Sequence, residues 1–301
     1  MVDVLYVLGH ARSGSTAIEG LISAAGPYRS YGELAHLPKM RDNFERCSCG
    51  ALIAECQFWL SVENEVVVPS LTRRQRVELL AVPKPLWSSA VRETARAHRN
   101  FFAHLGAHGE IPIDSSKTLH FSYLRPLYLS RMGVQVRGVL PVRNPEQVMV
   151  SASQGPGTQD RPQSHPVWAA GKTLVAWVLS NVIALIVLKA LNGRHETAVS
   201  YEAVAHAPVV LVGRVEHLSR QLLEQRTLEY FEHGVAGNRT RRQGSAVLTP
   251  PVERPLDRIP VALRVVCRLL AKPTTGLLKL DEPSVIHPEV VTNLDELAEV
   301  A

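Results

Sequence analysis

Residues 4–16 read VLYVLGHARSGST, and this stretch decides the expected fold. The apolar run of residues 4–8 is followed by a turn that holds Gly9 and Gly14, and then by apolar residues at helical spacing: Ile18, Leu21, Ile22 and Ala25. Glycines let the backbone wrap around an anion, and the N–H groups and positive dipole end of the helix point at that anion. We therefore predict a strand–loop–helix unit over residues 3–25 that cradles a phosphate.

The loop differs from a Walker A loop at one position. That motif reads G-x-x-x-x-G-K-S/T, with a lysine directly after the second glycine. Gly9 and Gly14 have this spacing, but Ser15 takes the place of the lysine, and the strong cation, Arg12, lies inside the loop. This pattern suits the 5′-phosphate of a nucleotide whose γ-phosphate is not transferred. It argues against a nucleoside or sugar kinase, which stays an alternative together with a non-catalytic nucleotide-binding protein.

Composition narrows the class of partner and the location of the protein. The 301 residues are 46% hydrophobic and 20% charged, with a net charge of +5. This mild positive balance favours an anionic small molecule over nucleic acid, because no basic block is longer than residues 239–242. We expect a cytoplasmic protein without a signal peptide, since a glycine interrupts the first apolar run at residue 9. Residues 174–191 are nearly all apolar, but they contain Ser180 and Asn181, and we expect a buried core helix rather than an integral membrane segment.

Strand and helix patterns alternate along the chain. We predict later strands at residues 111–114, 134–142 and 197–201, and helices within 71–108, 120–132 and 168–192 and after Pro145. This alternation predicts an α/β fold with a central, mainly parallel sheet flanked by helices. We expect residues 1–301 to form one domain. A loop-rich and helical region at about 26–108 would line the acceptor pocket, and the tail at about 243–301 has no assigned role.

Chemistry-bearing segments follow four predicted strands, at the edge where open α/β sheets bind ligands. They are the loop at residues 9–16, residues 114–117, Arg143 with Ser151, and residues 237–241. With these segments the chain resembles the bacterial sulfotransferases that use 3′-phosphoadenosine 5′-phosphosulfate (PAPS). The resemblance implies a P-loop-like three-layer sandwich.

The resemblance also implies the residues that bind the donor. Arg12-Ser13-Gly14-Ser15-Thr16 matches the family's loop for the 5′-phosphosulfate. Val142-Arg143-Asn144-Pro145 with Ser151 matches its V-R-[ND]-P-x5-S pattern for the 3′-phosphate. Gly237-Asn238 followed by Arg241 resembles the G-N-P-x-R loop that closes over the 3′-phosphate, although Arg239 replaces the proline. A guanidinium fork and a hydroxyl are donors that a phosphate needs.

Sulfuryl transfer is an in-line displacement at sulfur, and it needs oxygen donors and a base for the attacking hydroxyl. By the resemblance, Arg12 neutralises the leaving phosphate, Lys117 reaches the sulfuryl or bridging oxygen, and Glu33 is the candidate base. His10, His36 and His120 are alternative bases. No metal is expected, and the acceptor is expected to be a hydroxyl of a small molecule, glycolipid or sugar.

Three of the four cysteines, Cys47, Cys49 and Cys56, form a C-x-C-x6-C pattern. Structural zinc sites usually contain Cys-x2-Cys pairs, and no fourth ligand is obvious. The pattern therefore favours a structural turn with partly buried thiols. A zinc site, with His36 as a conceivable fourth ligand, and a disulfide stay alternatives.

Overall fold

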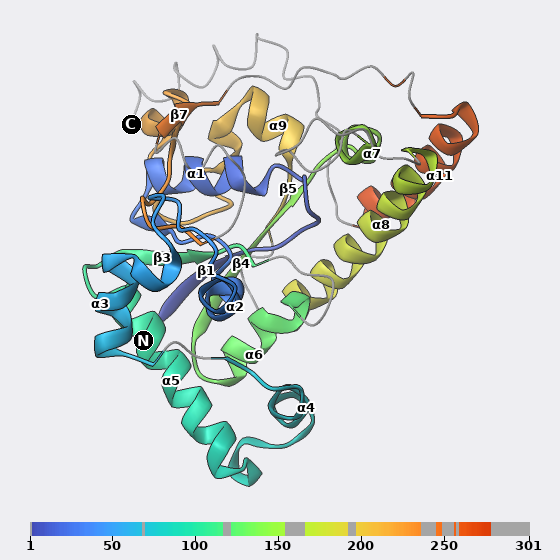
Figure 1. Ribbon diagram of the computed structural model, residues 1–301. Coiled ribbons are helices and arrows are strands. Elements are labelled where there is room, and N and C mark those ends of the chain that lie inside the picture. The colour runs from blue at the N-terminus through green and yellow to red at the C-terminus, as the bar shows by residue number, and fades with distance from the viewer. Residues whose placement is uncertain are drawn as a thin grey trace, which may run out of the picture.

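The computed structural model describes residues 2–67, 70–116, 122–153, 166–191, 197–235, 245–248, 256 and 259–277. Its centre is a five-stranded sheet with the strand order β2-β3-β1-β4-β5, in which each strand runs parallel to its neighbours (Figure 1). The strands are β1 (Asp3–Val7), β2 (Tyr28–Ser30), β3 (Ile111–Asp114), β4 (Gln135–Val142) and β5 (Thr197–Ser200). The predicted parallel sheet is confirmed.

After Asp3, the first strand is continuously apolar because it lies at the centre of the sheet with both faces covered. Leu5 and Val7 pack on one side of the sheet, and Val4, Tyr6 and Leu8 pack on the other. This division is the alternation that a pleated strand imposes. In register, Val4 lies opposite Val136 of β4, and Leu5 lies opposite Ile113 of β3.

Helices cover both faces of the sheet and complete a three-layer architecture (Figure 1). On one side α1 (Ser15–Ala25) packs with α9 (Tyr201–His206), α10 (Arg220–Glu224) and the strand β6 (Thr227–Glu229), which pairs antiparallel with β7 (Ser245–Val247). On the other side lie α5 (Ser89–Leu105), α6 (Arg125–Arg131) and α8 (Pro166–Ala190), whose buried aromatic residues include Phe101, Phe102 and Trp177.

Further elements extend these layers. They are the helices α2 (Leu37–Asp42), α3 (Gln57–Glu65), α4 (Arg73–Ala81), α7 (Pro145–Ser153) and α11 (Val261–Leu277), and the 3-10 turns η1 (Leu34–His36), η2 (Ile53–Glu55), η3 (Lys84–Leu86), η4 (Ser122–Leu124) and η5 (Pro208–Leu211). The expected helical stretch at 71–108 is divided into α4 and α5 at Pro83 and Pro85, because proline has no N–H to donate within a helix.

The first part of the expected loop-rich and helical region, residues 26–67, is more regular than the sequence suggested. It contains β2, which forms the edge of the sheet beside β3, and the helices α2 and α3. Strand β2 has three residues with Arg29 at its centre, so it lacks an apolar run that would have revealed it. It forms because its backbone groups pair with those of β3.

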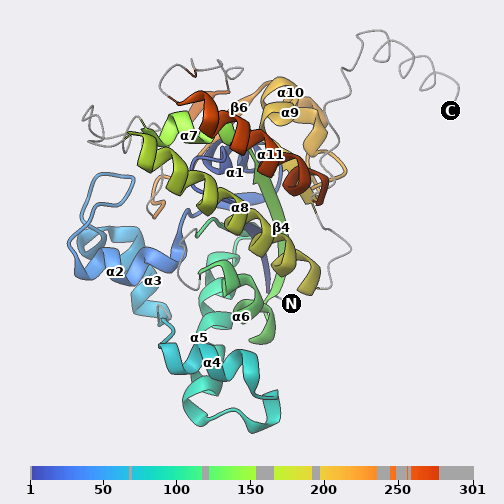
Figure 2. The same ribbon diagram turned by 90° about the vertical axis from the view of Figure 1, so that its right-hand side faces the viewer.

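Helix α8 differs from the buried core helix that we expected. Within it, Ala170–Ala190 is long and apolar enough to cross a membrane by length and composition, with a mean hydropathy of 2.0, and only 39% of that window is buried. One face packs on β4, α6 and α7, while Val175, Leu179 and Ile186 are exposed. Helix α11 lies beside α8 on this side of the molecule (Figure 2).

Candidate functional site

The turn after β1 has the backbone of an anion cradle. Gly9, Arg12 and Gly14 have positive φ angles of 102°, 67° and 81°. A Cβ atom on Gly14 would lie 1.9 Å from Cδ2 of Tyr201, so the close approach of this ring requires glycine. Gly14 is also the N-cap of α1, where no side chain caps the helix. The first N–H groups of α1 therefore point out of the helix end into the turn.

The Arg12 side chain crosses from this turn to α7. Its Nη1 atom donates to the backbone oxygen of Ser151 at 2.6 Å and to Ser151 Oγ at 2.9 Å. The sequence resemblance assigned these two residues to opposite ends of a nucleotide, and the direct contact between them was not predicted. Because the Ser151 hydroxyl accepts from Arg12, it keeps a proton to donate to another group.

Arg143 follows β4 and lies against the same turn. Its Nη1 atom is 3.4 Å from the backbone oxygen of Arg12, and its guanidinium carbon lies 4.9 Å from the centre of the Tyr201 ring. Its backbone oxygen accepts from Trp177 Nε1 at 3.1 Å, which ties the end of β4 to α8. These contacts hold the guanidinium over an aromatic ring and beside the cradle.

Two polar atoms at this place are buried without a partner in the part of the chain that the structure describes. They are Ser13 Oγ and Arg143 Nε. Leaving a donor buried and unpaired costs about 1–3 kcal/mol, so such groups call for an explanation. Both can donate, and both flank the glycine turn, so an anionic ligand with several acceptor oxygens would satisfy them. The residues present thus fit the phosphate groups of the expected donor.

Glu33 follows the edge strand β2 and forms a pair with a histidine. Its Oε2 atom lies 3.3 Å from His36 Nε2, and both side chains are partly exposed. Its backbone N–H donates to the Val235 oxygen at 2.8 Å, so the β2 end is fixed by a segment some 200 residues further on. Two of the alternative bases are thereby placed: His36 accompanies Glu33, and His10 lies against α8, with Nδ1 3.2 Å from Ser180 Oγ.

A buried network holds the end of β3. Asp114 accepts from Arg125 Nε at 2.9 Å and from the Ser116 N–H at 3.0 Å, and its side chain also binds the Ser116 hydroxyl. Tyr6 donates to the Ser116 oxygen at 2.9 Å. Burial raises the pKa of the Tyr6 phenol well above its ordinary value, and the charge of Asp114 and, more weakly, that of Glu33 act in the same direction. The Ser116 hydroxyl also accepts from the Ala35 N–H at 2.8 Å, so the network reaches the turn that follows Glu33.

The network was not predicted, because only its spatial contacts reveal it. It fixes the chain up to Ser116, one residue before the candidate Lys117. Lys117, His120, Gly237, Asn238 and Arg241 lie outside the described residues. The remaining candidates occupy one edge of the sheet: Arg12, Ser13, Gly14, Ser15 and Thr16 after β1, Arg143 and Ser151 after β4, and Glu33 after β2.

Comparison with known proteins supports the fold. No family model matches the sequence, and no curated protein matches it. Among solved structures, the chain is similar to the sulfotransferase domain of the Synechococcus PCC 7002 olefin synthase, with 15% identity, a TM-score of 0.50, and 93% of this chain and 96% of that chain covered. A sulfotransferase domain from the curacin biosynthetic pathway also matches, with 14% identity, a TM-score of 0.47, and coverage of 94% and 99%. The first likeness shows that the chain has the P-loop-like fold of a sulfotransferase domain.

Proposed function

We propose that this protein transfers a sulfuryl group from PAPS to a hydroxyl group of a small-molecule, glycolipid or sugar acceptor. The observation that carries the proposal is the convergence of Arg12, Ser13, Arg143 and Ser151 at one edge of the sheet, where Ser13 Oγ and Arg143 Nε are buried without partners among the described residues. The sulfotransferase-type fold supports it independently.

In this proposal the turn after β1 binds the 5′-phosphosulfate. The N–H groups at the start of α1 and the Ser13 hydroxyl donate to its oxygens, and Arg12 neutralises the phosphate that leaves. Ser15 and Thr16 begin α1 and continue this set of donors. Preorganised donors of this kind stabilise charge on a leaving group without having to move during the reaction.

The 3′-phosphate would bind between β4 and α7. Arg143 offers its guanidinium from the Tyr201 face, and Ser151 offers the hydroxyl proton that its contact with Arg12 leaves available. Arg12 of the 5′-phosphosulfate site is hydrogen bonded to Ser151 of the 3′-phosphate site. The two phosphate sites are therefore coupled through this contact. Gly237, Asn238 and Arg241 would close over this phosphate, as the sequence resemblance implies.

Glu33 would act as the base. Its carboxylate takes the proton of the acceptor hydroxyl, the hydroxyl oxygen bonds to sulfur, and the bond from sulfur to the 5′-phosphate oxygen breaks. The products are the sulfated acceptor and 3′-phosphoadenosine 5′-phosphate. His36, 3.3 Å from the carboxylate, would orient Glu33, and Lys117 would donate to the sulfuryl or bridging oxygen. The proposal assigns no step to a metal. It places the protein in the cytoplasm, where cysteines stay reduced, and none of the four cysteines forms a disulfide.

Binding of the desulfated donor tests the proposal first. We expect 3′-phosphoadenosine 5′-phosphate to raise the melting temperature, whereas ATP with magnesium should not, because a ligand stabilises the state that binds it. Arg143→Ala should weaken binding about 10- to 100-fold, the loss expected for a hydrogen bond to a charged group. Arg220→Ala, an exposed arginine on α10, is the matched control and should bind normally.

Transfer of radiolabelled sulfate from PAPS into a panel of hydroxyl compounds tests the reaction itself. Stabilisation by ATP with magnesium and none by 3′-phosphoadenosine 5′-phosphate would instead favour the kinase. Donor binding without transfer to any acceptor would favour a nucleotide-binding protein without activity.

A further inference from the structure

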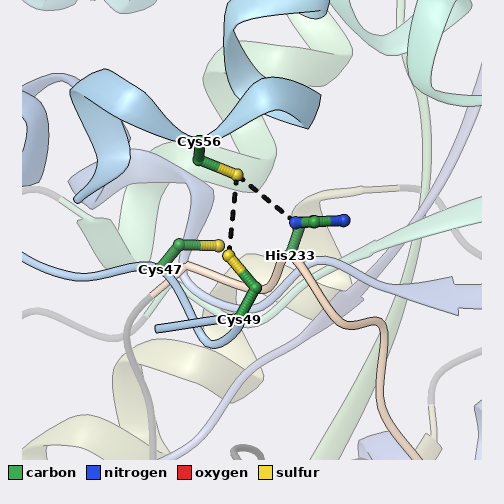
Figure 3. A group of neighbouring side chains, drawn as sticks. All are labelled: Cys47, Cys49, Cys56 and His233. Carbon is green, nitrogen blue, oxygen red and sulfur yellow. Dashed lines mark hydrogen bonds between the residues drawn. The ribbon is translucent and has the colours of Figure 1, made fainter. Parts of the chain in front are cut away.

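Four potential metal ligands, none of them among the proposed donor-binding residues, lie together in the fold (Figure 3). They are Cys47, Cys49, Cys56 and His233, and one ligand atom from each lies within 4.8 Å of all the others. Cys49 Sγ is 3.8 Å from Cys56 Sγ, and Cys56 Sγ is 3.3 Å from His233 Nδ1. Three cysteines and one histidine are a common ligand set of structural zinc sites.

These separations fit a tetrahedral zinc ion better than a disulfide. With Zn–S bonds of about 2.3 Å and a Zn–N bond of about 2.05 Å, tetrahedral angles put two sulfurs about 3.8 Å apart and a sulfur and a nitrogen about 3.6 Å apart. The two observed separations, 3.8 Å between the sulfurs and 3.3 Å between sulfur and nitrogen, lie close to these values. A disulfide would need the sulfurs at about 2.05 Å.

The backbone at Cys47 and Cys49 forms a tight hydrogen-bonded turn. The Gly50 N–H donates to the Cys47 oxygen at 3.0 Å, and Cys47 N–H donates to the Ala51 oxygen at 2.8 Å, which closes a tight loop with Gly50 at φ 95°. Cys56 is the N-cap of the nine-residue helix α3, which places it at the positive end of the helix dipole.

The fourth ligand comes from a distant segment and is held in place. His233 follows β6 and lies 177 residues after Cys56. Its ring stacks on Phe58 at 5.1 Å with an interplanar angle of 9°, and its backbone oxygen accepts from Trp59 Nε1 at 3.0 Å. Nδ1 faces the sulfurs and Nε2 points away from them (Figure 3). His36, the conceivable fourth ligand from sequence, is instead the partner of Glu33.

We propose that Cys47, Cys49, Cys56 and His233 bind a structural Zn²⁺ ion that joins residues 47–56 to the segment 231–235. Zinc binding replaces the thiol protons, and three thiolates with one neutral imidazole complete a closed tetrahedral site. This proposal revises the sequence-based preference for a simple structural turn, and it does not rest on the sulfotransferase activity.

The ion would secure the chain that supports Glu33. Ser48 already binds this segment, donating from its side chain to the Glu232 oxygen at 2.6 Å and from its N–H to the Gly234 oxygen at 3.2 Å. Two residues after His233, Val235 donates to the Tyr31 oxygen and accepts from the Glu33 N–H, both at 2.8 Å. Coordination of zinc by His233 would therefore help to hold Val235 in place, and Val235 in turn binds the chain at the end of β2.

Elemental analysis of the full-length chain purified without chelators tests the proposal. We expect about one zinc per chain, since structural sites of this type bind tightly. His233→Asn should weaken zinc binding at least about 100-fold, because losing a ligand costs more than losing a group that only orients one. Cys56→Ser should lose the metal as well. The controls are Cys267→Ser, a buried cysteine on α11, and His217→Asn, an exposed histidine, and both should keep one zinc.

Two measurements on the unaltered chain keep the test decisive if a cysteine variant does not fold. Cobalt substitution should give the intense visible bands of a tetrahedral thiolate site, and removal of zinc should lower the melting temperature until zinc is restored. The proposal is overturned if the protein contains no zinc and adding zinc does not change its melting temperature. It is equally overturned if mass spectrometry finds a Cys49–Cys56 disulfide in protein kept under reducing conditions.

Discussion

Replacing Gly14 by alanine probes the fit between the cradle and the Arg143 site. The new Cβ would meet two penalties: a φ of 81°, which L-residues rarely adopt, and the Tyr201 ring, with Cδ2 at 1.9 Å and Cγ at 2.7 Å. The left-handed backbone costs about 1–2 kcal/mol, and overpacking costs about 1–3 kcal/mol. We therefore expect Gly14→Ala to lower the free energy of unfolding by about 2–5 kcal/mol.

A matched control separates the two penalties. Gly109 has a φ of 82°, but nothing lies within 4 Å of the Cβ that it would gain. Gly109→Ala should therefore cost only the backbone strain, about 1–2 kcal/mol. Urea denaturation of both variants gives the two free energies, and their difference measures the contact with Tyr201.

The same substitution should weaken donor binding. Tyr201 cannot keep its place against a Cβ at residue 14, and its ring supports the Arg143 guanidinium at 4.9 Å. A lost cation–π contact of about 0.5–2 kcal/mol corresponds to an increase in the Kd of 3′-phosphoadenosine 5′-phosphate of about 2- to 30-fold. Calorimetric titration of Gly14→Ala and Gly109→Ala would show it, and the Gly109 variant should bind as the unaltered protein does.

The double variant Gly14→Ala/Tyr201→Ala tests the cause. Without the Tyr201 ring, Gly14→Ala should lose less unfolding free energy, because the overpacking penalty is gone. The effects of the two substitutions on the free energy of unfolding should therefore not be additive. Equal losses of stability in Gly14→Ala and Gly109→Ala, or strict additivity in the double variant, would refute this account of the turn.

Three further predictions concern other parts of the molecule. Glu33→Gln should lower kcat at least about 100-fold and leave the Kd of the desulfated donor unchanged, since it removes the base alone; unchanged turnover would assign the base elsewhere. Burial first, and then the charge of Arg125, lowers the pKa of His98 to about 3, so the unfolded chain binds more protons below pH 6.5 and stability falls with falling pH. Between pH 7 and pH 5 this amounts to about 2 kcal/mol, which His98→Gln should abolish in pH-dependent denaturation curves. Arg125→Met, which leaves the fully buried Asp114 without its ion pair, should cost about 3–5 kcal/mol, and adding Asp114→Asn should recover part of that loss.

The strands β1 and β4 and the turn after β1 could be predicted from the sequence, because short-range sequence patterns are strong there. The apolar runs of β1 and β4 and the glycine turn between β1 and α1 each depend on residues close in the chain. Their place at one edge of the sheet follows from parallel topology, which the alternation of strands and helices predicts. Whether the residues named for the site bind the donor stays a prediction.

Contacts between distant segments explain what the sequence could not predict. Arg12 meets Ser151 across 139 positions, and Cys56 meets His233 across 177. Strand β2 forms through pairing with β3, and α8 keeps an exposed apolar face although its sequence is apolar on all sides. Hydrophobic periodicity carries no information on partners of this kind, because it reports only which face of an element is covered.

Two of these features, the Cys56–His233 contact and the pairing of β2 with β3, lie on the Glu33 side of the sheet, and the fold explains why that side depends on them. At the centre, β1 pairs with strands on both sides, so the cradle that follows it is fixed by the core of the domain. Strand β2 is at the edge and has a neighbour on one side only, so the chain after it needs support from another segment. Val235 provides that support through two hydrogen bonds, and Ser48 binds the neighbouring residues Glu232 and Gly234. The turn after β1 can thus be predicted from a local motif, whereas the position of Glu33, the proposed base, depends on contacts that exist only in the folded protein.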